Sequence, residues 1–161
     1  MSLKIREIKP EDNQKIASII RTSLKEFGVD KPGTVYTDPT TDSLFELFQN
    51  QKSIYFIAEL NGEMLGGCGL FPTKGLPENC IELVKLYVSK EARGKKIGYE
   101  LLQKCIEKAK ELNQSSLYLE SLPELNNAVN LYESVGFKKL NSPLGESGHF
   151  ACDLWMLLEL N

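Results

Sequence analysis

The sequence predicts an α/β (α+β) protein in which a mixed β-sheet of about seven strands is flanked by about four helices. Seven short apolar runs are typical of strands, and four longer segments carry the apolar spacing of amphipathic helices. The dipeptide Asn61-Gly62 suits a two-residue type I′ turn, which joins two strands as an antiparallel hairpin. Strands and helices then alternate over residues 80–140, which implies parallel pairing through crossover helices.

The N-terminal region begins with a strand and a long helix. Residues 3–8 alternate apolar and charged side chains, as a half-buried strand does. A proline and two acids at 10–12 signal a helix start, and Gly28 marks its end. Residues 28–41 combine prolines, glycines and threonines, which predicts a loop, and a short helix is expected at roughly 42–49.

The predicted hairpin consists of strands at 54–60 and 63–71. Its second strand is unusual because glycine weakens a strand unless a bulge or a close backbone approach requires it. The glycines concerned are Gly66, Gly67 and Gly69. A loop at 72–79 then leads to an apolar strand at 80–88.

The C-terminal half continues with a long helix at 97–112, because its apolar residues recur with a 3.6-residue period. A strand is expected at 116–120. The spacing of a capping box in Ser121-Leu122-Pro123-Glu124 then predicts a helix that Gly136 ends. The last two strands are expected at 137–140 and 153–160.

Composition limits the classes of function. The 161 residues suit one domain, 1–161, and a net charge of −3 gives no general attraction to nucleic acid. No run approaches the ~20 apolar residues of a membrane span, and the N-terminus lacks the apolar core of a signal peptide, so a cytoplasmic protein is expected. The four cysteines are far apart with one histidine, His149, so no metal site is predicted and at least three cysteines are expected to be buried thiols.

The densest chemical signal is the segment that follows the strand at 80–88. There, Arg93-Gly94-Lys95-Lys96-Ile97-Gly98 connects a strand to a helix. The first N–H groups of a helix have no internal partners and favour an anion such as phosphate. The spacing is neither a Walker A loop nor a dinucleotide fingerprint, and from the residues alone a solvated basic connection is the alternative.

This segment resembles motif A of the GNAT (Gcn5-related N-acetyltransferase) superfamily, [Q/R]-x-x-G-x-[G/A]. Arg93 and Gly98 match its ends, and Lys96 replaces the middle glycine. The segment Leu131-Tyr132-Glu133-Ser134-Val135-Gly136-Phe137 resembles motif B of the same superfamily. The resemblance covers nearly the whole chain and extends to small bacterial acetyltransferases that act on amino acids.

The resemblance implies a GNAT fold with a splayed sheet and acetyl-CoA as the donor, with no metal. The cofactor-binding residues implied are Leu86, Tyr87, Val88, Arg93, Gly94, Lys95, Lys96, Ile97, Gly98 and Asn127. The pyrophosphate is expected at the turn amides, and the pantetheine arm at the strand backbone, where a splayed neighbour leaves groups free. The family's CoA-contacting asparagine is offset here, since Leu125 holds its position and Asn126 and Asn127 follow.

Two residues are candidates for proton transfer. Glu82, eleven residues before Arg93, resembles by its spacing the general base of some family members, and apolar neighbours are expected to raise its pKa. The alternative is a glutamate that faces solvent or pairs with Lys85. Tyr132 corresponds to the motif B tyrosine that protonates the CoA sulfur, and the alternative for it is a core aromatic residue.

The function expected is acetyl-CoA-dependent N-acetylation of a small amine, with a free amino acid as the favoured acceptor. A non-catalytic acyl-CoA-binding module, or acetylation of a protein N-terminus or a polyamine, are the alternatives. No nucleic acid or membrane partner is expected, and a homodimer is left open. His149 and Cys152 are interpreted as surface or capping residues or, alternatively, as a wall of the acceptor pocket, which Phe27 and Tyr36 would also shape.

Overall fold

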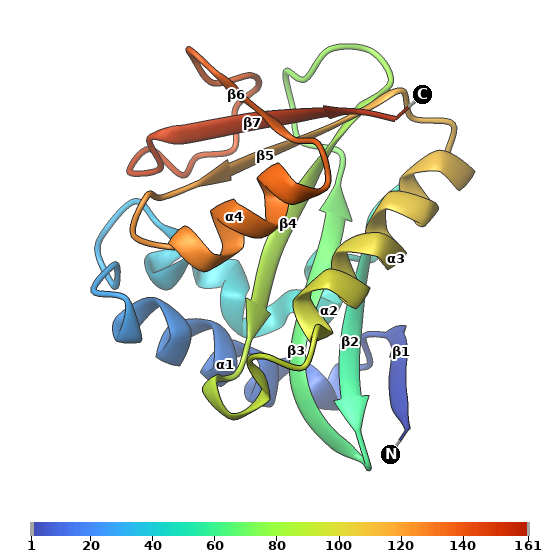
Figure 1. The fold of residues 1–161 in the computed structure, drawn as a ribbon, viewed down its shortest axis with the longest axis vertical. Helices are drawn as coiled ribbons and strands as arrows, with labels where there is room; N and C mark the ends of the chain where they lie inside the picture. Colours follow the sequence, from blue (N-terminus) through green and yellow to red (C-terminus); the bar gives the residue numbers. More distant parts are fainter. Residues whose placement is uncertain (1, 161) are drawn as a thin grey trace.

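The computed structural model describes residues 2–160 (Figure 1). Its seven-stranded sheet has the order β1-β2-β3-β4-β5-β7-β6. The strands are β1 (Leu3–Glu7), β2 (Ile54–Leu60), β3 (Glu63–Phe71), β4 (Cys80–Val88), β5 (Ser116–Ser121), β6 (Lys138–Leu140) and β7 (Leu154–Glu159). The helices are α1 (Asn13–Glu26), α2 (Leu44–Leu47), α3 (Ile97–Glu111) and α4 (Asn126–Ser134), with 3-10 turns η1 (Pro10–Asp12), η2 (Val35–Thr37), η3 (Pro39–Ser43) and η4 (Lys90–Ala92).

Helices cover both faces of the sheet, α3 and α4 on one and α1 and α2 on the other (Figure 1). Strand β2 shows why both faces must be covered. Phe56 and Ala58 belong to the apolar cluster under α3 and α4, whereas Tyr55 and Ile57 belong to the cluster under α1 and α2. Since side chains alternate along a strand, an almost wholly apolar strand needs a layer on each side.

The hairpin and the mixed sheet are confirmed, while two local predictions are wrong. Asn61 and Gly62 have φ values of 54° and 82°, as a type I′ turn requires. The capping box does not form, because Ser121 is still paired with Leu154 in the sheet and α4 begins only at Asn126. The strand after α4 was expected to pair in parallel with β5, but within the described part of the chain β6 does not pair with β5. Strand β7 lies between them and pairs antiparallel with both.

Strands β4 and β5 diverge. They pair in parallel only from Cys80–Ser116 to Glu82–Tyr118, and among residues 2–160 the rest of β4 has no strand partner on that side. On its other edge β4 stays paired with β3 as far as Val88. The split in the sheet that the family resemblance implies is therefore present.

A bulge interrupts the pairing of β3 with β4. The register shifts between Gly67 and Gly69, and Lys85 opposite has a φ of 55°. The glycines of β3 permit close packing there, because a Cβ on Gly67 would lie 2.5 Å from the Cε2 atom of Tyr55. Tyr55 lies on β2, and its buried side chain reaches past β3 to β4. Its hydroxyl donates a hydrogen bond of 2.7 Å to the carbonyl of Lys85, and this bond stabilises the bulge.

No helix within residues 2–160 combines the length and the apolar character that crossing a membrane requires.

Candidate active site

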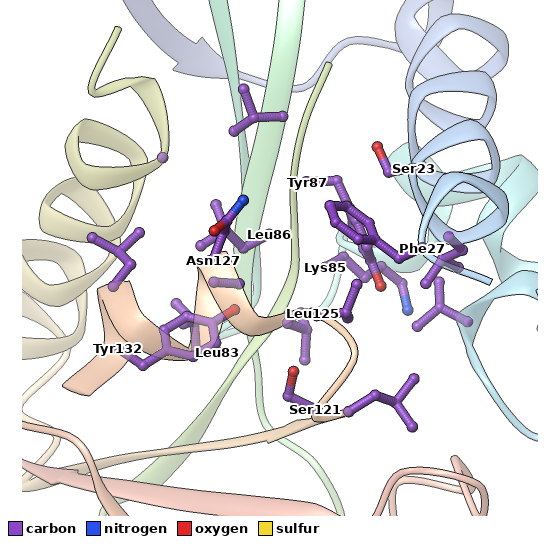
Figure 2. A pocket seen from close by; sticks show the side chains of 18 of the residues that line it. Ser23, Phe27, Leu83, Lys85, Leu86, Tyr87, Ser121, Leu125, Asn127 and Tyr132 are labelled. Carbon is purple, nitrogen blue, oxygen red and sulfur yellow. The ribbon is translucent and has the colours of Figure 1, made fainter. Parts of the chain in front are cut away.

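A cavity of about 440 Å³ lies where β4 and β5 separate (Figure 2). Figure 2 shows Tyr132 and Asn127 on one side of it and Ser23 and Phe27 on the other. We call the part beside the 93–98 turn the turn end, lined by Val88, Gly94, Lys96, Ile97, Gly98, Asn127 and Leu131. The part enclosed by α1 and the 28–43 and 141–153 loops is the loop end, lined by Ser23, Phe27, Thr34, Val35, His149 and Cys152.

The turn end is built on the N-terminus of α3. Lys96 precedes the helix in the left-handed conformation, with φ 61° and ψ 20°, and within the described part of the chain its side chain makes no capping hydrogen bond to the first turn. The first amide groups of a 15-residue helix are therefore free to bind an anion. The left-handed backbone costs a non-glycine residue roughly 1–2 kcal/mol, which explains why related motifs have glycine where this chain has Lys96.

The space beside Gly98 is not filled by neighbouring side chains. A Cβ atom there would make only ordinary contacts, 3.5 Å from Leu131 Cδ2 and 3.7 Å from Val88 Cγ2. Leu131, Val88 and Gly98 all line the cavity, so a side chain larger than alanine at this position would occupy it. The space, the free amides and the exposed ammonium of Lys96 fit a phosphate-bearing ligand.

The Arg93 side chain, which also lines the cavity, is held by contacts with α1 and β4. Its guanidinium forms an ion pair with Glu26, donates a hydrogen bond of 3.2 Å to the Val88 carbonyl and lies 5.1 Å from the centre of the Phe27 ring. The side chain thus ties the turn to α1 and to the end of β4. Lys95 is exposed and lies outside the cavity lining, as does Tyr36, which was expected to shape the acceptor side. The other predicted catalytic and cofactor-binding residues all contribute to the lining.

Glu82 lies at the point where β4 and β5 part. Its side chain is 3% exposed, and Thr73 Oγ1 donates a hydrogen bond of 2.5 Å to its Oε1 atom. Burial, assisted by the nearby charge of Glu120, raises the pKa of Glu82 to about 7, although the Thr73 hydrogen bond and Lys85 oppose the shift. Glu82 therefore does not face solvent, and no ion pair joins it to Lys85 within the described chain.

Tyr132 is both a packed residue and a lining residue. Its ring is 6% exposed and packs edge-on against Phe137, with 5.6 Å between ring centres. Its hydroxyl points into the cavity (Figure 2), and burial raises its pKa well above 10. The phenol is therefore protonated at neutral pH, in a position from which it can donate to a bound group.

Two loops close the loop end. The amide of Ala151 donates a hydrogen bond of 3.1 Å to the carbonyl of Gly33, and His149 Nε2 lies 3.0 Å from Asp38 Oδ2. Burial alone would raise the pKa of Asp38, but hydrogen bonds from His149 and Thr40 lower it to about 2. His149 thus lines the cavity, which agrees with its interpretation as a wall residue.

Sequence reasoning missed three charged groups beside the cavity. Lys85 and Glu120 line it, and Asp38 holds His149 in its wall. Glu120 accepts hydrogen bonds from Tyr118, at 2.7 Å, and from Ser147. The only signal for Lys85 was a second charge, besides Glu82, inside a mainly apolar strand. The contacts of Asp38 and Glu120 depend on loops whose course the sequence does not reveal.

Comparison with known proteins identifies the family. The model of the Acetyltransferase (GNAT) family matches residues 17–137. The chain belongs to this family.

Relatives over the full length support that assignment. The uncharacterized N-acetyltransferase YjgM of Escherichia coli (strain K12) is 35% identical over 97% of this chain and 94% of its own. A GNAT-family acetyltransferase from Staphylococcus aureus Mu50 has a TM-score of 0.85 at 22% identity, covering 99% of this chain and 100% of that one. The yncA protein of Salmonella typhimurium, solved with acetyl-CoA, has a TM-score of 0.76 at 20% identity, covering 100% and 95%.

Family membership makes the protein an N-acetyltransferase whose donor is acetyl-CoA. The GNAT fold expected from the motifs is confirmed. The lining residues fit that donor, because the free amides of α3 suit its phosphates and the unpaired edge of β4 suits its extended amide arm.

Proposed function

We propose that the protein transfers the acetyl group of acetyl-CoA to the amine of a small molecule, with a free amino acid as the favoured acceptor. The observation that carries this proposal is the pair of loops at the loop end of the cavity. The 28–43 and 141–153 loops are joined by the Ala151–Gly33 and His149–Asp38 contacts, and residues from both loops line the cavity there. Two joined loops beside the site leave less room for an extended peptide than for a small acceptor.

The donor is assigned to the turn end. The pyrophosphate binds the amide groups between Arg93 and Gly98, and the exposed ammonium groups of Lys95 and Lys96 add attraction. The pantetheine arm lies along the free edge of β4 at Leu86, Tyr87 and Val88, and Asn127 lines the same cavity. This placement brings the thioester toward the point where β4 and β5 part.

The reaction requires three events near that point. The amine nitrogen attacks the thioester carbonyl, and Glu82 accepts its proton, directly or through a water molecule. Since the pKa of Glu82 is about 7, a substantial fraction of this carboxyl is ionised at neutral pH. A backbone N–H of Leu86 or Tyr87 stabilises the oxyanion. As the C–S bond breaks, the leaving thiolate takes the hydroxyl proton of Tyr132.

A binding module without turnover is the rival from another class. It requires no proton acceptor, so a buried carboxyl of raised pKa and a buried phenol that line the same cavity favour the enzyme. The decisive experiment presents acetyl-CoA with a panel of amino acids, amines and short peptides and monitors release of free thiol. We expect amino acids to give the largest kcat/KM. Acetyl-CoA binding without thiol release for any acceptor would support the module instead.

A further inference from the structure

Lys85 is a buried ammonium group with no assigned role. It is 9% exposed and lines the cavity beside Glu82. Within residues 2–160 no hydrogen bond or ion pair joins its Nζ atom to another side chain. Burying a charge without a partner is costly, so such a group is retained where a ligand can supply the opposite charge.

The carboxylates near Lys85 already have other partners. Asp38 accepts hydrogen bonds from His149 and Thr40, at 3.0 Å and 2.7 Å, and Glu82 accepts one from Thr73. Asp38 and Glu82 are nonetheless close enough to raise the pKa of Lys85, which burial lowers overall. The Lys85 ammonium group therefore feels the negative charge of Asp38 and Glu82, but it forms no ion pair with either within residues 2–160.

The bulge in β4 explains the orientation of Lys85. Along a regular strand Leu83 and Lys85 would face one way and Val84 the other. The bulge changes this order, since Leu83 and Leu86 pack under α3 and α4, whereas Lys85 lies in the field of Asp38 and Cys152 at the loop end. The Tyr55 hydrogen bond to the Lys85 carbonyl fixes this orientation.

We propose that Lys85 binds the carboxylate of the acceptor, so that the enzyme selects amines that also carry a carboxylate. This inference rests on the proposed function. Glu82 and Lys85 lie three residues apart on one strand and border the same cavity, so one zwitterionic molecule can present its amine to the first and its carboxylate to the second. A polyamine would place a second cation next to the Lys85 ammonium and be repelled.

The test uses matched acceptors that differ only in the acidic group: each amino acid, its carboxamide and the amine that lacks the carboxyl group. For the parent enzyme we expect kcat/KM to be highest for the amino acid. Lys85→Met should lower that value about 10- to 100-fold, mainly through KM, and change the carboxamide value little, because a charge-assisted hydrogen bond is lost only with the acid. Lys85→Arg should retain part of the preference for the acid.

Lys139→Met, on the exposed face of β6, is the matched control for loss of a lysine charge and should leave the preference unchanged. Melting curves verify that each variant is folded. An equal loss for acid and carboxamide in Lys85→Met, or an unchanged preference for the acid, would overturn the proposal.

A binding measurement separates this inference from the proposed function. Calorimetric titration of the CoA-bound protein with the same trio of compounds needs no turnover. Amino-acid binding that Lys85→Met abolishes supports the carboxylate site even if no thiol is released, and in that case the proposed function fails alone. If the parent binds the carboxamide as tightly as the acid, or binds neither at millimolar concentration, the carboxylate site is wrong.

Discussion

Burial determines the protonation of Glu82. Glu82 is 3% exposed, and the pKa of its carboxyl, about 7, lies well above the ordinary value of 4.5. Between these two values the folded chain binds more protons than the unfolded chain, so the free energy of unfolding falls as pH rises through this window. The ionised carboxylate that the proposed base role requires is thus obtained at the expense of stability.

Glu82→Gln tests both consequences. The amide keeps the shape and can still accept the Thr73 hydrogen bond, but it does not titrate. We expect the fall in stability between about pH 5 and pH 8, about 3 kcal/mol at most, to diminish in the variant. Turnover should drop about 100-fold or more at neutral pH and less above the pKa of the acceptor amine. Parallel pH–rate profiles for the two proteins would exclude the base role.

The packing of the Tyr132 ring and the chemistry of its hydroxyl can be tested separately. Its ring packs against Phe137, whereas its hydroxyl faces the cavity without a hydrogen bond inside the described chain. Tyr132→Phe should therefore leave the melting temperature nearly unchanged and lower kcat about 100-fold, with the affinity for CoA retained. Single-turnover kinetics and CoA titration measure the two effects, and equal kcat values in variant and parent rule out the acid role.

At the scale of elements, local signals predicted some features and not others. Asn61-Gly62 encodes its turn through backbone preference alone, so the hairpin was predictable. The bulge at Lys85 depends on a hydrogen bond from Tyr55, thirty residues earlier, and on the register of two strands. Ser121 has the spacing of a helix cap but lies in β5, because strand pairing outweighs a local capping preference.

The candidate site, like the fold, was predictable only where the signal lies within one short segment of the sequence. Motifs A and B identified the turn and Tyr132, and the apolar neighbours of Glu82 indicated its raised pKa. The arrangement of Arg93 with Glu26 and Phe27 was not predictable, because these residues meet only when α1 packs beside β4. The same holds for the wall that Asp38 and His149 form between two distant loops.

A side chain added at Gly98 on α3 should impair donor binding, whereas one added at Gly67 on β3 should impair stability. At Gly98 the cavity has room for a larger group, so Gly98→Val should fold with a melting temperature close to that of the parent but bind acetyl-CoA at least tenfold more weakly. At Gly67 a Cβ would lie 2.5 Å from the Tyr55 ring and 2.9 Å from the Phe56 carbonyl. Gly67→Ala should therefore lower stability by a few kcal/mol. Thermal unfolding and CoA titration of both variants test this, and unimpaired CoA binding by Gly98→Val would contradict the position of the donor.

On the scale of the whole molecule, the sheet has one weak seam. Strands β1 to β4 form one continuous part and β5 to β7 another, and the two pair only from Cys80–Ser116 to Glu82–Tyr118. Beyond that pairing, the two parts diverge and both contribute residues to the cavity. A donor bound there contacts both parts, because β4 and α3 line the cavity together with β5 and α4.

This arrangement predicts the response to acetyl-CoA. A ligand that binds only the folded chain adds about 2.7 kcal/mol to the free energy of unfolding at 100 times its dissociation constant, which for a chain of this length raises the melting temperature by about 5–11 °C. Because the ligand joins both parts, amide hydrogen exchange should slow in β5 and α4 as well as in α3. Exchange that slows in α3 alone would contradict the joining of the two parts. A melting temperature that millimolar acetyl-CoA leaves unchanged would contradict binding in the cleft altogether.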